Sequence, residues 1–246
     1  MLLEVTDLAY AYGSLQAVAG ASFHIESGEI FGFLGPNGAG KTTTISCLCG
    51  LLTPQSGSIT LDGQAFMPWS KTAHRAHLGV VPQELAVYGE LSGRENLQFI
   101  GQLQGLQGKA LEQAVERALE FSGLQDRAKD RVKQYSGGMK RRLNLAMGDL
   151  HQPRLLLLDE PTVGVDPQSR NHLFESLRFL RQEGRTLLYT THYMEEAQRL
   201  CDRVAILNEG KIVAVGNAET LAEQAGIPGA NLEEVFLKLT GRSLRD

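Results

Sequence analysis

A short stretch, GPNGAGKTT at residues 35–43, combines residue types that bind phosphate. It matches the pattern G-x-x-x-x-G-K-T, with Gly35, Gly40, Lys41 and Thr42 at the fixed positions. Glycines let a loop curl until its backbone N–H groups face an anion. A lysine adds charge toward the β- and γ-phosphates, and a threonine hydroxyl can bind Mg²⁺. The stretch therefore predicts binding of a nucleoside triphosphate. The alternative, a glycine turn beside an incidental lysine, would rarely fill every fixed position.

Two carboxylates, Asp159 and Glu160, follow the run of four leucines at 155–158. Such a run predicts a buried parallel strand that delivers both carboxylates to the edge of the sheet. Neighbouring side chains on a strand point to opposite faces, so the two can have different roles. We expect Asp159 to hold the Mg²⁺ shell and Glu160 to orient or deprotonate a water that attacks phosphorus. A strand that simply ends in a capping acid is the alternative.

Two further polar residues stand where predicted strands end. Gln83 follows the apolar strand at 78–81, and His192 follows the strand at 186–191. Proteins of the α/β class bind ligands at the carboxyl ends of parallel strands, so His192 could contact a γ-phosphate and Gln83 could offer a hydrogen bond. Each signal alone is weak, because an isolated histidine is more often a structural residue.

The sequence YSGGM at 135–139 opens a predicted helix and offers a second anion site. Ser136 suits an N-cap, and Gly137 and Gly138 leave the first amides uncovered, as in helix termini that bind anions. From these residues alone, a plain capped helix is the favoured alternative. We expect the cationic residues that follow, at 140–142, to form a solvated face of the helix.

The elements that position these residues are a mixture of strands and helices. Alternating apolar and polar residues at 2–34 predict antiparallel strands that lead into the strand before the phosphate-binding loop. Within this region Tyr12 could stack on an adenine face or pack within a strand. The glutamine-rich segment at 92–123 predicts a helical insertion that forms a separable lobe. A last helix is predicted at 231–240, where apolar residues recur at helical spacing.

The composition narrows the classes of partner. The 246 residues carry 24 cationic and 28 anionic side chains, and the formal net charge of −4 gives no general attraction to nucleic acid. Three scattered cysteines, Cys47, Cys49 and Cys201, predict reduced thiols rather than a disulfide framework. No further ligand accompanies His74 and His77 at metal-binding spacing, so we expect no metal there. No apolar run approaches the roughly 18 residues that span a bilayer, so we expect a soluble, cytoplasmic chain.

The order of these motifs resembles the ATP-binding subunit of ABC transporters, and the resemblance covers almost the whole chain. The motifs that carry it are GPNGAGKT at 35–42, Gln83, YSGGM at 135–139, LLLLDEP at 155–161, GVD at 164–166 and His192. The resemblance implies an α/β fold, a P-loop NTPase core with an N-terminal antiparallel β subdomain and an inserted α-helical subdomain. It implies an ATP-binding domain at 1–226, with the helical subdomain at roughly 84–152, and a C-terminal helical tail at 227–246.

The resemblance also implies roles at the ATP and Mg²⁺ site. Glu160 would be the general base and His192 the γ-phosphate contact, and Gln83 and Lys41 would assist catalysis. Thr42, Gln83 and Asp159 would hold the metal. Tyr12 would stack on adenine, and the remaining nucleotide-binding residues would be Gly35, Pro36, Asn37, Gly38, Ala39, Gly40, Lys41, Thr42 and Thr43.

Other implied roles concern a second subunit. Ser136, Gly137 and Gly138 would complete that subunit's ATP site in trans, and Asp166 would bridge the two subunits. The second subunit would be another copy of the chain or a homologous ATPase. Separate transmembrane permease subunits would be the further partners, so the chain would meet the membrane only through them, at its cytoplasmic face, and would bind no nucleic acid.

Short segments indicate a branch of the family. LSGRENL at 91–97, YSGGMKRRLNLA at 135–146 and LEEVFLKLTGRSLRD at 232–246 resemble ATPases of the second export type, which serve drug, polysaccharide or lipid exporters. Two departures from the family pattern stand out: Tyr135 and Met139 replace the ends of LSGGQ, and VGVD replaces AGLD. The alternative function is a soluble regulatory ATPase switch of the same superfamily. The acidic composition and the missing coiled-coil insertion or second domain argue against it.

Overall fold

The computed structural model describes residues 1–241, so the last five residues of the tail predicted at 227–246 lie outside the described part. The chain divides into two units. Unit 1 comprises Met1–Arg75 together with the residues from Thr186 onward, and unit 2 comprises Ala76–Arg185.

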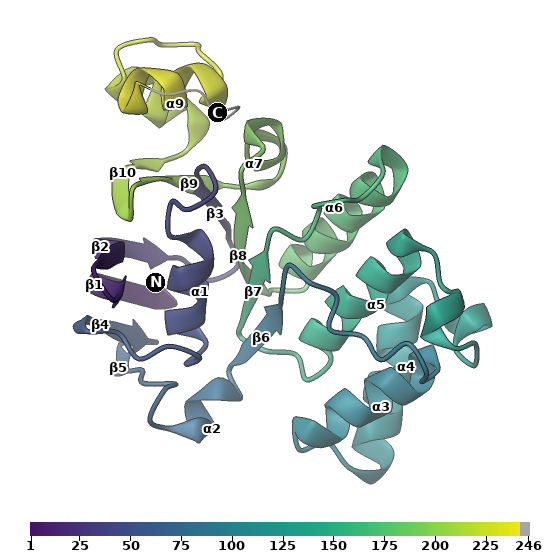
Figure 1. Ribbon diagram of the computed structural model, residues 1–246. Coiled ribbons are helices and arrows are strands. Elements are labelled where there is room, and N and C mark those ends of the chain that lie inside the picture. The colour runs from purple at the N-terminus through teal and green to yellow at the C-terminus, as the bar shows by residue number, and fades with distance from the viewer. Residues whose placement is uncertain (242–246) are drawn as a thin grey trace. The chain divides into compact units, whose positions relative to one another are not determined.

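Unit 1 contains an antiparallel sheet, as the alternation at 2–34 predicts. Its strands lie in the order β2 (Leu15–Ile25), β1 (Leu3–Tyr12), β4 (Ser56–Leu61) and β5 (Gln64–Ala65), and each pair of neighbours is antiparallel. Figure 1 shows β1, β2 and β4 side by side. Alternate residues of β2 are buried at its C-terminal end, which gives the sheet one apolar face.

The other strands of unit 1 surround β3 (Ile30–Leu34). It pairs in parallel with β8 (Thr186–Thr191) and with β9 (Arg203–Asn208), and β10 (Lys211–Gly216) forms an antiparallel hairpin with β9. Every residue of β3 and β8 is buried, as expected for strands that are covered on both faces. Because β3 runs directly into the predicted phosphate-binding loop, and the loop into α1 (Lys41–Leu48), this central strand fixes the position of the loop.

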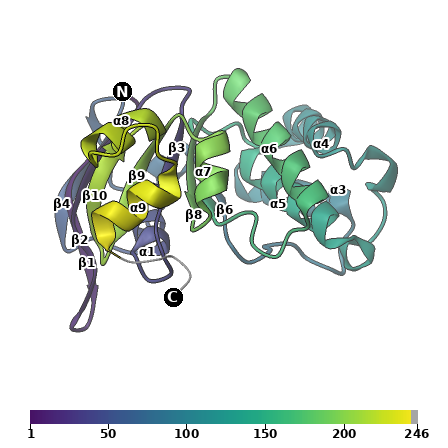
Figure 2. The same cartoon turned by 90° about the horizontal axis from the view of Figure 1, so that it is seen from above.

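The helices of unit 1 pack mostly in its C-terminal part. α7 (Met194–Leu200), α8 (Ala218–Gln224) and α9 (Leu232–Thr240) share one apolar cluster with β3 and β9. Figure 2 shows α8 and α9 together beside β10. The predicted last helix is therefore a packed element of unit 1. The short α2 (Thr72–Arg75) lies elsewhere, and its His74 accepts a hydrogen bond from the Met67 N–H at 2.9 Å.

Unit 2 consists of a parallel strand pair and a group of helices. β6 (Leu78–Val81) pairs with β7 (Leu155–Asp159), and α6 (Pro167–Gln182) follows β7. The helices α3 (Gly93–Leu103), α4 (Gly108–Ser122) and α5 (Gly137–Asp149) lie together in Figure 1. They pack around a common apolar cluster that includes Leu97, Val115, Leu119 and Leu143. The short helices η1 (Gln125–Arg127) and η2 (Val132–Gln134) join α4 to α5.

Local signals place the ends of these helices. Ser92 and Glu95 form a capping box at the start of α3, and Gly123 ends α4 with a φ of 61°. The helical segment predicted at 92–123 is thus present as α3 and α4. No helix among residues 1–241 has both the length and the apolar composition needed to cross a bilayer.

Candidate functional site

The predicted phosphate-binding loop connects β3 to α1. Gly38 and Gly40 have φ angles of 82° and 100°, in the left-handed region that favours glycine. A Cβ on Gly40 would also collide with the carbonyl oxygen of Ala17. Gly35 is not left-handed, but a Cβ there would collide with the carbonyl oxygen of Leu207. The curl of the loop therefore requires two of these glycines, and close packing requires the third.

The Lys41 ammonium lies inside this loop. Its Nζ donates to the carbonyl oxygens of Gly35 at 2.7 Å and Pro36 at 3.0 Å, and the residue is only 4% exposed. Positive charge, the backbone of the curled loop and the start of α1 meet here, which is the composition of an anion site. Thr42 is exposed in the first turn of α1 and Thr43 is half-buried.

His192 stands at the same edge of unit 1 as the loop. β3 and β8 pair with Leu34 opposite Thr191, so Gly35 and His192 are the next residues on adjacent strands. The Gly35 N–H also donates to the Thr191 carbonyl oxygen at 3.4 Å. His192 is half-buried, and its ring packs against that of Tyr193 with centroids 4.0 Å apart. Unit 1 therefore brings together the phosphate-binding loop and the histidine that the sequence singled out.

Tyr12 ends β1 in unit 1 and is 51% exposed. Its ring forms an edge-to-face pair with the ring of Tyr10, and the two ring centroids are 5.0 Å apart. Half of the side chain remains available to a planar ligand. Its role on adenine stays a prediction.

Unit 2 gathers a second set of predicted residues at the end of its strand pair. In the parallel pair of β6 and β7, Val81 lies opposite Leu158. Gln83 and Glu160 each come two residues after that pair, so they stand at equivalent positions after the two strands. Asp159 and Glu160 are each 5% exposed, whereas Gln83 is exposed.

The backbone changes direction at the second carboxylate. β7 ends at Asp159, and Glu160 has a left-handed φ of 43°. The strand alternation that we expected for this pair therefore stops at Asp159. A non-glycine residue in this conformation is strained, and such strain is concentrated at functional sites.

The YSGGM segment begins α5 as predicted. The Ser136 Oγ accepts a hydrogen bond from the Met139 N–H at 3.2 Å, so Ser136 caps the helix. Ser136 and Gly137 are both exposed. A Cβ on Gly137 would meet no atom within 4 Å, whereas a Cβ on Gly138 would collide with the Ser169 Oγ. The helix therefore presents its N-terminus to solvent at Gly137, where an anion can approach the amides.

Asp166 has a local role in addition to the predicted one. Its Oδ1 accepts a hydrogen bond from the Ser169 N–H at 2.9 Å, which makes it the N-cap of α6. Hydrogen bonds from Ser169 hold the pKa of this exposed carboxyl below its usual range. The bridge between subunits stays a prediction.

The structure contradicts the expectation that residues 140–142 form a solvated charged face. Arg141 is only 8% exposed, and it donates through Nη1 to the Gln83 carbonyl oxygen at 2.8 Å and through Nη2 to the Val163 carbonyl oxygen at 2.9 Å. Arg142 donates to the Ser122 carbonyl oxygen at the end of α4, at 2.5 Å. Positions 140 and 142 are about 200° apart around a helix, so three consecutive residues cannot all face solvent on a helix that packs on several sides.

Asn144 is a second residue that the sequence reasoning missed. It is 2% exposed, and its Oδ1 accepts a hydrogen bond from the Ala86 N–H at 3.2 Å. Arg141 and Asn144 are three residues apart, so they lie on one face of α5. A usable signal was present in the sequence: Asn144 directly follows Leu143, one of the apolar residues that recur at helical spacing at 139, 143, 147 and 150, and an amide buried beside such residues needs a polar partner.

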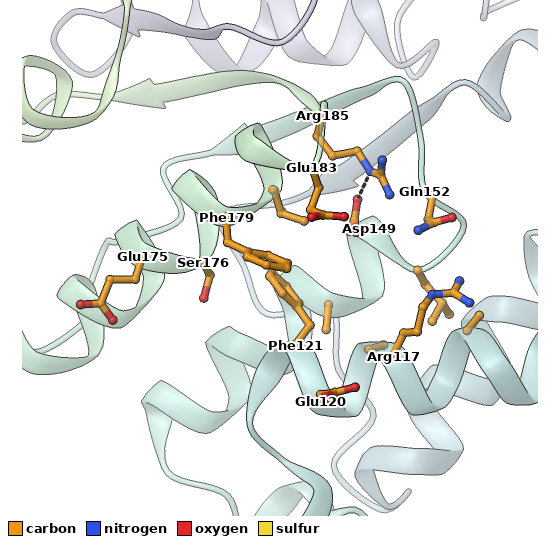
Figure 3. Close-up of a pocket in the computed structure, with 15 residues that line it drawn as sticks. Arg117, Glu120, Phe121, Asp149, Gln152, Glu175, Ser176, Phe179, Glu183 and Arg185 are labelled. Atoms are coloured by element: carbon orange, nitrogen blue, oxygen red, sulfur yellow. Dashed lines mark hydrogen bonds and ion pairs between the residues drawn. The ribbon is translucent and has the colours of Figure 1, made fainter.

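A cavity of about 610 Å³ in unit 2 is lined by none of the predicted site residues. It lies between α4, the end of α5 and α6, and Figure 3 shows Phe121 and Phe179 facing each other there. Their ring centroids are 6.0 Å apart, and Arg185 is paired with Asp149 at 3.0 Å. Burial raises the pKa of the Asp149 carboxyl, although Arg185 opposes this effect. Within unit 2, these contacts join α4 to α6 and the end of α5 to Arg185.

The predicted site residues thus form two groups. Unit 1 carries Tyr12, the loop at 35–43 and His192, and unit 2 carries Gln83, Ser136, Gly137, Gly138, Asp159, Glu160 and Asp166. In each unit, the pairing of two parallel strands places the residues that follow them side by side: Gly35 and His192 in unit 1, and Gln83 and Glu160 in unit 2.

Comparisons with known proteins show the family to which the chain belongs. A family model described as ABC transporter matches residues 18–163. The chain is 46% identical over 226 residues to the linearmycin resistance ATP-binding protein LnrL of Bacillus subtilis (strain 168), with 92% of this chain and 72% of that protein covered. It is 43% identical over 234 residues to the Nod factor export ATP-binding protein I of Paraburkholderia xenovorans (strain LB400), with 95% and 76% covered.

Solved structures show the same fold. A structure described as the ATP binding subunit of an ABC transporter has a TM-score of 0.87 and 31% identity, covering 98% of this chain and 100% of that one. The cbiO1 protein of Clostridium perfringens, part of the ABC transporter complex cbiONQ, has a TM-score of 0.82 and 29% identity, with 91% of both chains covered.

Proposed function

The chain belongs to the ABC transporter family as an ATP-binding, ATP-hydrolysing subunit, and from this premise we propose that two such subunits close head to tail around two ATP molecules. Each subunit would give its phosphate-binding loop to one ATP and the N-terminus of α5 to the other. Closure and reopening would drive transport through separate transmembrane subunits. A soluble regulatory switch finds no support in the relatives found.

The loop at 35–43 would hold the triphosphate. The left-handed backbone at Gly38 and Gly40 and the buried Lys41 ammonium support this role. With ATP, the ammonium would exchange its bonds to the carbonyl oxygens of Gly35 and Pro36 for bonds to phosphate oxygens. Tyr12, exposed in the same unit, would stack on the adenine.

Thr42, Gln83 and Asp159 would hold Mg²⁺ together with the ATP. Their hydroxyl, amide and carboxylate oxygens are the hard ligands that Mg²⁺ prefers, and a site shared with phosphates needs only one or two carboxylates. This donor set is compatible with the finding that no group of three or more His, Cys, Asp or Glu in the described part of the chain could hold a metal ion. When bound, the ion neutralises charge on the β- and γ-phosphates.

Glu160 would act on the attacking water, and His192 would contact the γ-phosphate. As the water oxygen bonds to the γ-phosphorus, its proton passes to the Glu160 carboxylate and the bond to the β-phosphate oxygen breaks, which yields ADP and phosphate. Glu160 is 5% exposed and directly follows the buried strand β7, and a buried carboxylate next to a rigid strand supports the role of a preorganised base.

The observation that carries the shared site is the exposed start of α5. Open space surrounds Gly137, and no carboxylate is found at the cap, where Ser136 uses its hydroxyl. An exposed helix N-terminus of this kind favours phosphate oxygens. We propose that Ser136, Gly137 and Gly138 face the ATP of the second subunit and that Asp166 bridges the two subunits.

A surface of unit 2 suits the membrane partner. Leu85, Tyr88, Phe99 and Leu103 are between 37% and 68% exposed, and the rings of Tyr88 and Phe99 are in contact with centroids 5.1 Å apart. A group of exposed apolar side chains marks an interaction surface. We propose that a short helix of a transmembrane permease docks beside the segment 83–89 and α3, so that the chain lies on the cytoplasmic face of the membrane. The name of the Nod factor export ATP-binding protein I supports export as the direction.

The Glu160→Gln variant tests the head-to-tail closure. We expect it to be a monomer without nucleotide and a dimer with saturating ATP and Mg²⁺, because ATP binds but is not hydrolysed and the closed state persists. Light scattering after size exclusion measures the mass. The control is Lys41→Ala in the same background, which should stay a monomer. If Glu160→Gln remains a monomer while equilibrium binding shows it saturated with ATP, the proposal is wrong.

A further inference from the structure

We propose that Arg141 is a positioning residue for ATP hydrolysis, which makes the Gln83 segment and the loop at 163–166 move together with α5. This inference rests on the proposed function, which assigns Mg²⁺ to Gln83, the bridge between subunits to Asp166 and the second ATP to the start of α5. Arg141 itself would touch neither ATP nor the attacking water.

The contacts of Arg141 are unusual for a buried cation. Both of its hydrogen bonds go to backbone carbonyl oxygens, of Gln83 and of Val163, and no carboxylate pairs with it in the described part of the chain. Burial alone lowers the pKa of its guanidinium. Removing a charge from water is unfavourable unless it is well compensated, so this arginine contributes something that an apolar residue would not. The planar guanidinium has donors in a fixed fork, which allows it to bridge two separate segments.

One of the two segments follows β6. There, α5 holds the chain at two points: Arg141 binds the Gln83 carbonyl oxygen, and Asn144 accepts from the Ala86 N–H at 3.2 Å. Both side chains are less than 9% exposed, so water cannot easily replace these bonds. A displacement of α5 would therefore carry the backbone of Gln83 with it.

The other segment is the loop between β7 and α6. Val163 lies midway between Glu160, whose carbonyl oxygen accepts from the Val163 N–H at 3.2 Å, and Asp166, which caps α6. Arg141 is one helical turn after Gly138, at the N-terminus that would meet the second ATP. A contact made at that N-terminus is therefore linked through one side chain to the backbone at the Mg²⁺ ligand Gln83 and next to the general base Glu160.

Arg141 would act on closure of the dimer and not on ATP binding. Replacing it should therefore lower the rate of hydrolysis and leave the affinity for ATP almost unchanged. We expect Arg141→Gln to lower kcat about tenfold, the effect of losing one hydrogen bond to a charged group, with the Kd of ATP changed less than about twofold. Arg141→Lys should give an intermediate kcat, because a compact ammonium cannot bridge both carbonyl oxygens. In the Glu160→Gln background, Arg141→Gln should weaken dimer formation about tenfold.

Arg142→Gln is the matched control, since Arg142 is the neighbouring arginine and its bond goes to the end of α4. Hydrogen exchange read by mass spectrometry gives a local measurement. Arg141→Gln should speed exchange in peptides covering both 83–88 and 161–166. Arg142→Gln should speed exchange near 122–124 instead and leave kcat within about twofold of wild type.

Two results would overturn the inference. One is an unchanged kcat in Arg141→Gln. The other is a loss of kcat that only follows the loss of thermal stability, in the same proportion for Arg141→Gln and Arg142→Gln. Failure of the proposed function is distinguishable, because it appears in Glu160→Gln with Arg141 intact. If that variant dimerises with ATP and the double variant dimerises equally well, only the Arg141 inference fails.

Discussion

Gly137 can separate a functional role of the YSGGM segment from a structural one. A Cβ at this position would meet no atom within 4 Å, and the residue is not left-handed. We therefore expect Gly137→Ala to leave the free energy of unfolding unchanged or to raise it by up to about 1 kcal/mol, since alanine favours helix. In the proposed dimer the new methyl group would stand between the amides of α5 and the second ATP. ATPase activity should fall at least about tenfold, as when a phosphate-facing donor is lost.

Gly138→Ala is the contrasting variant in the same helix turn. Its Cβ would collide with the Ser169 Oγ, so it should lower both the melting temperature and the ATPase activity. ATPase assays and thermal melts of the two variants measure the difference. Full turnover by Gly137→Ala would exclude this helix terminus from the ATP site.

Single residue types predicted the chemistry better than they predicted its geometry. Gly38, Gly40 and Lys41 could be read from the motif because a curled anion-binding loop tolerates few other residues. The left-handed turn at Glu160 could not, because nothing in LLLLDEP distinguishes a strand that continues from one that bends at its second carboxylate. Arg141 was missed for a related reason: its partners are backbone carbonyl oxygens, which every sequence contains.

At the scale of elements, Asp166 connects α6 to the proposed dimer. Asparagine is as good an N-cap as aspartate, so Asp166→Asn should keep the bond to the Ser169 N–H and the stability of α6, whereas Asp166→Ala should lower the melting temperature. The pKa of Asp166 is lowered in the folded chain, so its contribution to stability is present above the usual aspartate pKa and is lost as the pH falls through the lowered value.

The pair of variants then decides what Asp166 does between subunits. If the carboxylate charge bridges them, Asp166→Asn should lower ATP-driven dimerisation in the Glu160→Gln background while its thermal melt at pH 7 stays like wild type. Size exclusion with light scattering and differential scanning calorimetry provide the two measurements. Dimerisation that falls only in Asp166→Ala would reduce Asp166 to its capping role.

The order of strands and helices along the chain was largely predictable from the sequence, but the sides of each helix that are buried were not. The apolar runs at 30–34 and 155–158 predicted buried parallel strands, because a strand covered on both faces has no polar alternation. Apolar residues recur at helical spacing at 139, 143, 147 and 150, which predicts one apolar face for α5. The helix is nevertheless buried on several sides, with Arg141, Leu145 and Gly148 among its buried residues. Which sides of a helix are covered depends on segments that are distant in the sequence, here those at Gln83 and Val163.

For the molecule as a whole, the division of the site residues between two units has a thermodynamic consequence. The phosphate-binding loop belongs to unit 1, whereas Asp159, Glu160 and Gln83 belong to unit 2. A ligand that binds only the folded state stabilises whatever must be folded to bind it. If residues of unit 1 hold ATP and Mg²⁺ binding requires Asp159 of unit 2, ATP with Mg²⁺ should raise the melting temperature more than ATP alone does.

Melting temperatures measured with EDTA, with ATP and EDTA, and with ATP and Mg²⁺ test this directly. At 100 times its Kd, ATP should stabilise the wild-type chain by about 2.7 kcal/mol, and Mg²⁺ should add a further increment. Asp159→Asn should keep the increment from ATP alone and lose the one from Mg²⁺, because the loop still holds the phosphates while the carboxylate ligand is gone. Tyr12→Ala, the control, should reduce the ATP increment and keep that of Mg²⁺. A full Mg²⁺ increment in Asp159→Asn would show that unit 2 does not supply the metal's carboxylate.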